Sequence, residues 1–205
     1  MYLKPSEEYY KLTGKKNLYN IMPIENMASV ITNGILCFNK TLSTKHKSIA
    51  MNDVQERRSK ITIPNGLPLH CYANLYFAYN NPMLYKRRNE AESFCILVIS
   101  HNVLDIEGCI LSDQNASTSL ARFFTPYDGI KKLNFQKIFA KSWTNDDYYE
   151  YQRHKAIKCA EILIPDYIPY DYIIGAYVLN HTSEEKLLKQ GFEKPIRTNA
   201  TIFYR

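Results

Sequence analysis

The stretch KCAEILIPD at residues 158–166 places one carboxylate inside an otherwise apolar run. Residues 159–164 have the length and composition of a buried strand. Because side chains alternate across a strand, Glu161 is expected to lie on the opposite face from Ala160 and Ile162. An unpaired buried carboxylate is unfavourable, so Glu161 must either find partners or take up a proton. Its place in this strand therefore needs a functional or structural reason.

Length and composition suit one globular domain, which we expect to cover residues 1–205. Of these residues 45% are hydrophobic and 22% are charged, which is ordinary for a soluble protein with its own core. No stretch approaches the roughly 20 apolar residues that cross a bilayer. The polar N-terminal segment lacks the apolar middle of a secretory signal. We therefore expect a cytoplasmic protein without a membrane partner.

The cysteine pattern gives no sign of a disulfide framework or a zinc site. The five cysteines are odd in number, widely spaced and never arranged as CxxC: Cys37, Cys71, Cys95, Cys109 and Cys159. Most have apolar neighbours, which is typical of reduced thiols in a core. We therefore expect this protein to bind no metal.

Positive charge exceeds negative charge by six, and the sequence pI is near 8.9, which favours a polyanionic partner such as nucleic acid. Basic residues cluster at 57–60, 86–88, 131–132 and 153–158. Several of the 17 tyrosines stand beside basic or amide residues, and sites for single-stranded nucleic acid combine positive charge with aromatic stacking platforms. The alternative is that these groups lie on separate solvated surfaces that never converge.

Hydrophobic patterning predicts a mixed α+β fold. The expected strands cover 18–22, 35–38, 73–78, 93–100, 158–164 and 171–179. The expected helices cover 24–34 with Gly34 as the C-cap, much of 134–154, and 183–190, while 48–60 is either a polar helix or an extended loop. Residues 80–88 are expected to form a loop with at most one helical turn, and two short strands around a turn near 197–199 to close the chain. Glycine-rich nucleotide loops and the HExxH and GxSxG motifs are absent from the sequence.

Four segments carry a resemblance to a known family. They are LYNIMPIENMASVITNGIL at 18–36, DVQERRSKITIPNGLPLHCYANLYFAYNNPMLY at 53–85, SFCILVIS at 93–100 and RHKAIKCAEILIPD at 153–166. In their order and spacing these segments resemble the DarT family, DNA ADP-ribosyltransferase toxins of bacterial toxin–antitoxin pairs. Asn20, where family members often carry a histidine, suggests a divergent branch.

The resemblance implies an ADP-ribosyltransferase fold, in which two packed, mainly antiparallel sheets hold NAD in a cleft. It implies that the enzyme uses NAD as co-substrate, releases nicotinamide and joins ADP-ribose to thymine or guanine in single-stranded DNA. It also implies an antitoxin partner with a macrodomain that removes the adduct. Two alternatives remain open: a non-catalytic binder of single-stranded nucleic acid, and an ADP-ribosyltransferase that acts on protein or RNA.

Glu161 matches the catalytic position of the family. Cleavage of the nicotinamide–ribose bond develops positive charge on the ribose, the same problem that glycosidases face. The leaving group already carries positive charge, so what helps is a carboxylate that hydrogen-bonds the ribose and stabilises the cation. The alternative is a structural glutamate on a strand edge, paired with Lys158 or Arg153.

Arg57 and Arg58 match a basic pair from which the family draws an essential arginine. An arginine can clamp the pyrophosphate of NAD with paired hydrogen bonds and polarise the incoming base. Adjacent residues on a helix point in different directions, so the two arginines cannot do the same job. One of them is expected to lie on a solvated helix face, and the sequence does not distinguish which.

Five residues are expected at the NAD pocket on the strength of the resemblance: Tyr19, Asn20, His70, Tyr76 and Phe77. The amide of Asn20 can bind ribose or nicotinamide through both a donor and an acceptor, although a role in a turn is an equal alternative. Tyr76 and Phe77 are strand neighbours, so one of them must face the core. His70 is also consistent with a satisfied histidine near a turn.

Overall fold

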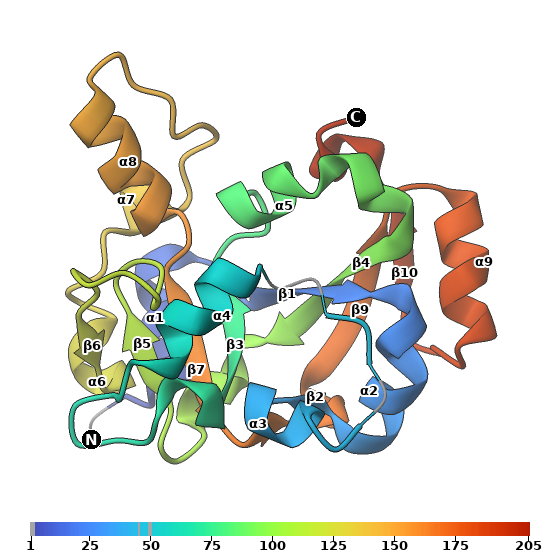
Figure 1. Cartoon of the computed structure of the whole chain (residues 1–205), viewed down its shortest axis with the longest axis horizontal. Coiled ribbons are helices and arrows are strands. Elements are labelled where there is room, and N and C mark those ends of the chain that lie inside the picture. Colours follow the sequence, from blue (N-terminus) through green and yellow to red (C-terminus); the bar gives the residue numbers. More distant parts are fainter. Residues whose placement is uncertain (1–2, 45, 49–50) are drawn as a thin grey trace.

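An eight-stranded sheet forms the centre of the protein, for which the computed structural model describes residues 3–44, 46–48 and 51–205 (Figure 1). Its strands are β1 (Asn17–Pro23), β3 (Tyr72–Tyr76), β4 (Phe94–Ser100), β5 (Ile110–Ser112), β6 (Phe123–Phe124), β7 (Glu161–Pro165), β9 (Ile173–Val178) and β10 (Ile196–Thr198). In space they follow the order β10-β9-β4-β1-β3-β7-β5-β6. Neighbours are antiparallel except for β9 and β10. A separate antiparallel pair joins β2 (Ile35–Leu36) to β8 (Tyr167–Ile168).

The large sheet parts between its two central strands. β1 pairs with β4 over seven consecutive residues, and β3 pairs with β7 over five. In the described residues, by contrast, β1 and β3 share one registered pair, Tyr19 opposite Tyr76. Two ladders, β10-β9-β4-β1 and β3-β7-β5-β6, are therefore joined at a single point. The predicted α+β class is confirmed, and the two ladders correspond to the two mainly antiparallel sheets that the resemblance implied.

The alternation expected around Glu161 is confirmed by the packing. Ala160, Ile162 and Ile164 belong to the main hydrophobic core, with residues of β1, β3, β4 and the helices α1 (Pro5–Thr13), α2 (Met27–Asn33) and α9 (His181–Lys189). Leu163 packs in a smaller cluster that includes Tyr72 of β3. Glu161 therefore opens β7 on the face that is turned away from the main core.

The remaining α-helices of the described residues have 4 to 10 residues, and three of them surround the line where the sheet parts. The remaining α-helices are α3 (Phe38–Thr41), α4 (Asn52–Ser59), α5 (Pro82–Lys86), α6 (Pro126–Gly129), α7 (Phe135–Ile138) and α8 (Tyr148–Ile157), and the three beside this line are α4, α5 and α8. Figure 1 shows α4 in front of β1 and β3, with α8 and α5 on opposite sides of a gap above them. No residue of α8 is buried, so this helix stands off the body of the protein.

Most predicted elements are confirmed with shifted ends. The strands predicted at 18–22, 73–78, 93–100 and 171–179 correspond to β1, β3, β4 and β9, and the helices at 24–34, 48–60 and 183–190 correspond to α2, α4 and α9. Gly34 ends α2 with φ of +74°, as expected of a C-cap glycine. The predicted helical turn in 80–88 is α5. Residues 49–50 of the predicted helix lie outside the described residues.

Four predicted boundaries need correction. β7 begins at Glu161, because Lys158 is still the C-cap of α8. β2 is shorter than predicted, because its partner β8 has two residues and Phe38 already begins α3. The segment 139–147 between α7 and α8 is a loop rather than helix. At the C-terminal end, the turn predicted near 197–199 is wrong, because β10 occupies Ile196–Thr198. Residues 200–203 form a 3-10 helix instead of a last strand, and their apolar side chains pack into a separate buried cluster.

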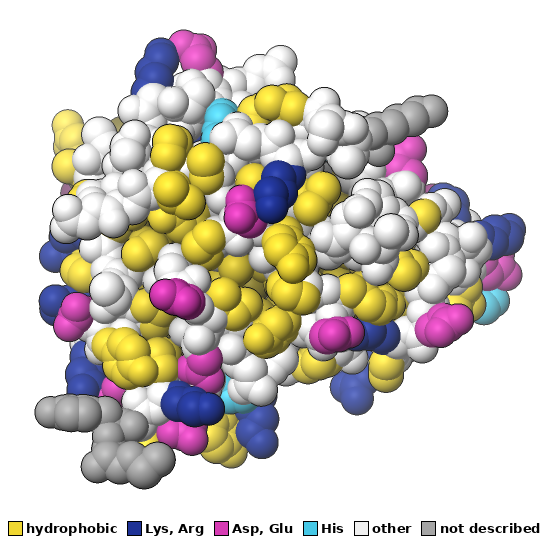
Figure 2. All heavy atoms as spheres, turned by 90° about the horizontal axis from the view of Figure 1, so that it is seen from below, with side chains coloured by type: hydrophobic (Ala, Val, Ile, Leu, Met, Phe, Trp, Pro, Cys, Tyr) yellow, Lys and Arg dark blue, Asp and Glu magenta, His cyan; other side chains and the backbone are white. Residues whose placement is uncertain are grey.

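The face seen from below in Figure 1 carries side chains of every type. Hydrophobic side chains gather in its middle, and lysine and arginine side chains are interspersed with acidic ones around them (Figure 2). Positive charge is therefore not concentrated on this face.

Candidate active site

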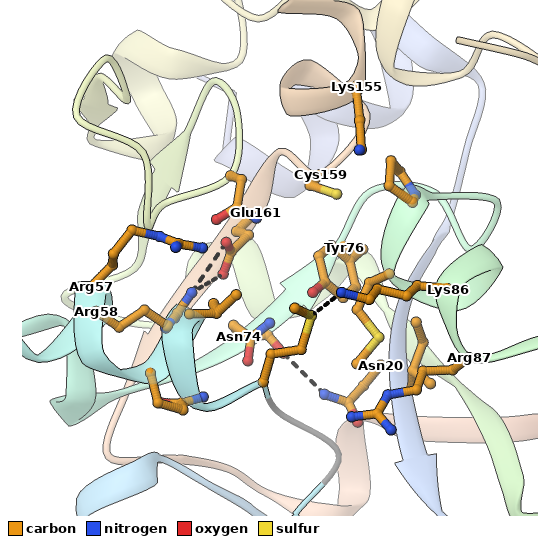
Figure 3. A pocket seen from close by; sticks show the side chains of 17 residues that line it. Asn20, Arg57, Arg58, Asn74, Tyr76, Lys86, Arg87, Lys155, Cys159 and Glu161 are labelled. Atoms are coloured by element: carbon orange, nitrogen blue, oxygen red, sulfur yellow. Dashed lines mark hydrogen bonds and ion pairs between the residues drawn. The ribbon is translucent and has the colours of Figure 1, made fainter. Parts of the chain in front are cut away.

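A pocket of about 380 Å³ lies where β1 and β3 part (Figure 3). Both strands and α4, α5 and the chain leading into β7 contribute to its lining. The charged residues of the lining are one acid, Glu161, and five bases: Arg57, Arg58, Lys86, Arg87 and Lys155. Basic residues from three clusters far apart in the sequence therefore converge on one pocket.

Glu161 is 1% exposed and is held by four hydrogen bonds. Arg58 Nη1 donates to both carboxylate oxygens, at 3.2 and 2.9 Å, and the backbone N–H of Ala116 donates to Oε1 at 2.9 Å. The N–H of Glu161 itself donates to Ser112 Oγ at 3.1 Å. These contacts offset the free-energy cost of burying the carboxylate, because they pair its charge and fix its position.

The alternative partners of Glu161 lie elsewhere. Lys158 donates to the carbonyls of Ile138 and Ala140, and Arg153 forms an ion pair with Glu150 at 3.5 Å. The salt bridges considered for a structural glutamate are therefore not formed, and Arg58 takes their place.

Arg57 and Arg58 diverge as expected of helical neighbours. Arg58 is 8% exposed and points at Glu161, whereas the side chain of Arg57 is 52% exposed and pairs with Asp53 at 3.3 Å (Figure 3). Both line the pocket. The arginine buried in the cleft is Arg58, and Arg57 stands at the rim.

Two buried acceptors in the pocket lack a partner. Asn20 is 7% exposed, and its Nδ2 donates to the carbonyl of Asn74 at 3.0 Å. Among the described residues no group donates to Asn20 Oδ1 or to Gln55 Oε1, although both atoms are buried. An unpaired buried carbonyl is unfavourable, so a ligand with hydroxyl or amide donors would stabilise this wall. The ribose hydroxyls and the carboxamide of NAD are donors of this kind.

Tyr76 faces the pocket, and Phe77 belongs to the core. Phe77 is buried, with its ring centroid 5.8 Å from that of Tyr9 and 5.6 Å from that of Phe135. Burial, followed by the nearby carboxylate of Glu161, raises the pKa of Tyr76 well above its usual value of 10.0. The Tyr76 hydroxyl is therefore a neutral donor at physiological pH. The expectation that Phe77 contacts NAD is corrected, because strand alternation turns it away.

Tyr19 and His70 also lie outside this pocket. Tyr19 packs edge to face on Tyr79, with 5.2 Å between the ring centroids, on the opposite side of β1 from Asn20. His70 lines a smaller neighbouring pocket of about 180 Å³ and stacks on Phe38 at 4.1 Å. Burial, and then the charge of Arg58, lower the pKa of His70, so its ring is neutral. Direct contact of Tyr19 with NAD is therefore not supported by its position, and His70 is placed beside the pocket.

The thiol of Cys159 lines the pocket without being a reactive thiolate. Burial, and then the carboxylate of Glu161, raise the pKa of Cys159 to about 12. A nucleophilic cysteine needs a lowered pKa, so the Cys159 thiol is protonated and contributes only a small apolar surface to the pocket.

Sequence reasoning missed several lining residues that periodicity could have found. Gln55 lies one helical turn before Arg58, and Asn74 lies two residues before Tyr76 on the same face of β3. Lys86 and Lys155 belong to basic clusters that the sequence does show. Their convergence was not predictable, because it depends on how α5 and α8 pack.

Residues 19–204 match the family model described as ssDNA thymidine ADP-ribosyltransferase, DarT. The chain belongs to the DarT family.

Two relatives in this family illustrate the range of similarity. The DNA ADP-ribosyl transferase of Thermus sp. (strain 2.9) is 29% identical over 183 residues, which cover 84% of this chain and 85% of the relative. A DNA ADP-ribosyl transferase–DNA ADP-ribosyl glycohydrolase fusion protein of Thermosipho africanus (strain H17ap60334) is 25% identical over 198 residues, which cover 92% of this chain and half of the fusion.

The fold of this chain matches that of the Thermus sp. 2.9 DarT. The structure of that protein in complex with ADP-ribosylated ssDNA superposes with a TM-score of 0.80 at 25% identity, and the match covers 92% of this chain and 96% of the other. Its structure in complex with NAD+ gives a TM-score of 0.75 at 23% identity, with 92% and 98% covered.

Proposed function

We propose that this protein transfers ADP-ribose from NAD to a base of single-stranded DNA and releases nicotinamide. The observation that carries the proposal is a buried carboxylate, Glu161, aimed into a pocket whose other charged residues are all cationic. Membership of the DarT family supports DNA as the acceptor, and the family description favours thymine over guanine.

Glu161 is the proposed catalytic residue. Its Oε2 accepts from Arg58 and keeps capacity for a further hydrogen bond, which a ribose hydroxyl would donate. The negative charge then lies beside the carbon at which positive charge develops as nicotinamide leaves, and the fixed position of the carboxylate avoids reorganisation at that moment. Arg58 orients the carboxylate through Nη1, and its remaining N–H groups would bind the pyrophosphate.

The residues of the cleft fit NAD. Asn20 Oδ1 and Gln55 Oε1 would accept hydrogen bonds from its ribose or carboxamide, and the Tyr76 ring would pack against nicotinamide. When bound, NAD supplies the ADP-ribosyl group and a leaving group that already carries positive charge. Direct contacts from Tyr19 and Phe77 are not part of the proposal.

The rim of the pocket suits single-stranded DNA. Arg57, Lys86, Arg87 and Lys155 are placed to neutralise phosphates on either side of a base that enters between α5 and α8. A single strand presents its bases without the free-energy cost of unpairing a duplex. We therefore propose that residues 1–205 act as one catalytic domain on single-stranded DNA.

The cellular role follows from the same proposal. Modified bases would block replication, so the protein would act as a toxin in the cytoplasm, where bacterial DNA lies. None of the helices in the described part of the chain is long and apolar enough to cross a bilayer. One relative is fused to a DNA ADP-ribosyl glycohydrolase, which supports a macrodomain antitoxin that removes the adduct as the partner of this protein.

Mass spectrometry of DNA tests the proposal. The protein is incubated with NAD and single-stranded oligonucleotides that contain thymine but no guanine, or guanine but no thymine, with a duplex, an RNA and a carrier protein as further substrates. A gain of one ADP-ribose on the thymine strand, and on none of the last three, is expected. Tight DNA binding with no adduct on any strand would establish the non-catalytic alternative instead, and an adduct on the RNA or the protein alone would establish the other.

A further inference from the structure

Lys158 is a buried lysine without an acidic partner. It is 1% exposed, and its Nζ donates to the carbonyls of Ile138 at 2.8 Å and Ala140 at 2.7 Å and to Asn80 Oδ1 at 3.1 Å. Within the described ranges, it forms no ion pair at all. Lysine is almost never fully buried unless it is paired, so three neutral acceptors for three N–H donors are an unusual arrangement.

The three acceptors tie together two sides of the gap above the pocket. Ile138 ends α7, Ala140 begins the loop toward α8, and Asn80 lies between β3 and α5. Asn80 Nδ2 also donates to the carbonyl of Ala140 at 3.1 Å, which closes the network. The ammonium group therefore links the segment 139–157, which we call the outer segment, to the chain that leads into α5.

The outer segment is also attached to α7 and to the core. His154 Nε2 hydrogen-bonds the carbonyl of Lys137 at 3.0 Å, Glu150 pairs with Lys137 at 3.2 Å, and Ile157 packs partly buried against the main core. Its helix α8 buries no residue, and the loop before it contacts α5 through Trp143, whose ring centroid lies 6.0 Å from that of Tyr85. Its last turn accepts one backbone hydrogen bond, from Asn115 N–H to the carbonyl of Ala156 at 3.0 Å. This segment carries Lys155, which lines the pocket from the side of α8 (Figure 3).

Glu161, only three residues further on, is fixed independently of Lys158. Its strand pairs on both sides, with Tyr76 and with Ser112, and its carboxylate is held by Arg58 and the N–H of Ala116. Loss of the Lys158 network would therefore loosen the outer segment from the β3–α5 connection, while its contacts with α7 and the NAD side of the cleft stay in place.

We propose that Lys158 is a positioning residue for the DNA substrate, whose ammonium group holds the outer segment against the β3–α5 connection and so sets the place of Lys155 at the pocket mouth. The inference rests on the proposed function, because it assigns a part of the same site to the DNA strand. On this proposal the NAD side of the cleft is held by the contacts of Glu161, whereas the position of the DNA side depends on the buried charge of Lys158.

The protonation of Lys158 gives this role a pH dependence. Burial lowers the pKa of Lys158 to about 8, against a small opposing effect of Cys159. The titratable or charged groups on the surrounding elements come from α7, the loop, α8 and the Asn80 side: Lys137, Lys141, Asp146, Asp147, Tyr148, Tyr149, Glu150, Tyr151, Arg153, His154, Lys155, Cys159, Tyr79, Tyr85 and Lys86. Above its pKa the neutral amine has two N–H donors for three acceptors, so the network loses one hydrogen bond and its charge. The apparent KM for DNA should therefore rise as pH increases past about 8.

Steady-state kinetics of Lys158→Met and Lys158→Arg test the role of this side chain. Lys158→Met is expected to raise KM for single-stranded DNA about tenfold, since it removes charge-assisted hydrogen bonds. KM for NAD and kcat should stay within about twofold, because Glu161 keeps its own contacts. Lys158→Arg is expected to restore KM for DNA at neutral pH and to remove its rise above about pH 8, because guanidinium stays charged. Lys189→Met, an exposed lysine of α9, is the matched control and should behave as wild type.

Several outcomes would overturn the role of Lys158. They are an unchanged KM for DNA in Lys158→Met, a rise in KM for NAD as large as that for DNA, and a wild-type profile for DNA that is flat across about pH 7 to about pH 9.5. If Lys158→Met does not fold, the wild-type profile and Lys158→Arg decide the matter. A wild-type protein that modifies no DNA would refute the proposed function itself, which is a different result from any of these.

Discussion

Removing the carboxylate of Glu161 should weaken both catalysis and the fold, and the two effects can be separated. In Glu161→Ala, Arg58 loses acceptors at 2.9 and 3.2 Å while it remains 8% exposed. Breaking one side of a buried ion pair destabilises a protein by about 3–5 kcal/mol, because the other charge stays buried without a partner. For a protein of this size each kcal/mol lowers Tm by roughly 2–4 °C, so a fall of about 6–20 °C is expected.

Replacing both partners should restore stability without activity. In the double variant Arg58→Met/Glu161→Met two apolar side chains fill the space of the pair, and such replacements are neutral or stabilising by about 1–4 kcal/mol. Its Tm should therefore return close to the wild-type value, with a small remaining loss because the buried N–H of Ala116 no longer has the Glu161 oxygen as its acceptor. Its rate of ADP-ribose transfer should stay at least about a hundredfold below wild type, as in Glu161→Ala, because the stabilising charge is missing.

Thermal unfolding followed by circular dichroism, and transfer of ADP-ribose to an oligonucleotide followed by mass spectrometry, give the two readouts. A double variant that melts as early as Glu161→Ala would refute the explanation by an unpaired arginine. A double variant with wild-type transfer would refute the catalytic role of Glu161, whatever its stability.

Three further changes probe the pocket. Arg57→Gln should alter the free energy of unfolding by less than about 0.5 kcal/mol, because its ion pair with Asp53 is exposed. The same change should make the salt dependence of DNA binding shallower, and an unchanged salt slope in a binding titration would show that Arg57 does not contact DNA. Asn20→Ala should raise KM for NAD about tenfold with a smaller effect on kcat, and an unchanged KM would show that its free oxygen meets no part of NAD. The pKa of His70 lies below its usual 6.5, so its contribution to stability is complete above that pH and is lost as pH falls. In denaturant titrations, His70→Gln should therefore lose less free energy of unfolding than the wild type between about pH 7 and about pH 5, and an equal loss in both proteins would assign the effect to other groups.

Local pattern was enough to predict the strands that form the two ladders. β4 and β9 are short apolar runs of β-branched and bulky residues, whose strand preference does not depend on distant contacts. The same preference for apolar runs placed the start of β7 three residues too early, because it counted Lys158, Cys159 and Ala160 as part of the strand. The structure makes these residues the end of a helix and a turn, and the Lys158 ammonium binds carbonyls 20 and 18 residues earlier in the chain.

The candidate site was only partly predictable for a similar reason. Glu161 stood out because a carboxylate in an apolar strand is locally improbable. The choice between Arg57 and Arg58 needs the rotation of α4 relative to the sheet, which only packing fixes. Tyr19 and Phe77 were expected at the pocket beside residues that do line it. Strand alternation turns Phe77 into the core, whereas Tyr19 shares a face with Tyr76 but packs on Tyr79 outside the pocket.

Because one registered pair joins β1 to β3, the large sheet has a weak line of hydrogen bonding between its two ladders. Each half keeps its own hydrogen-bonded ladder, so bending at the Tyr19–Tyr76 pair changes the angle between the halves without breaking either one. Such a bend would change the width of the cleft, and the main hydrophobic core, which packs across both ladders, limits how far the halves can turn.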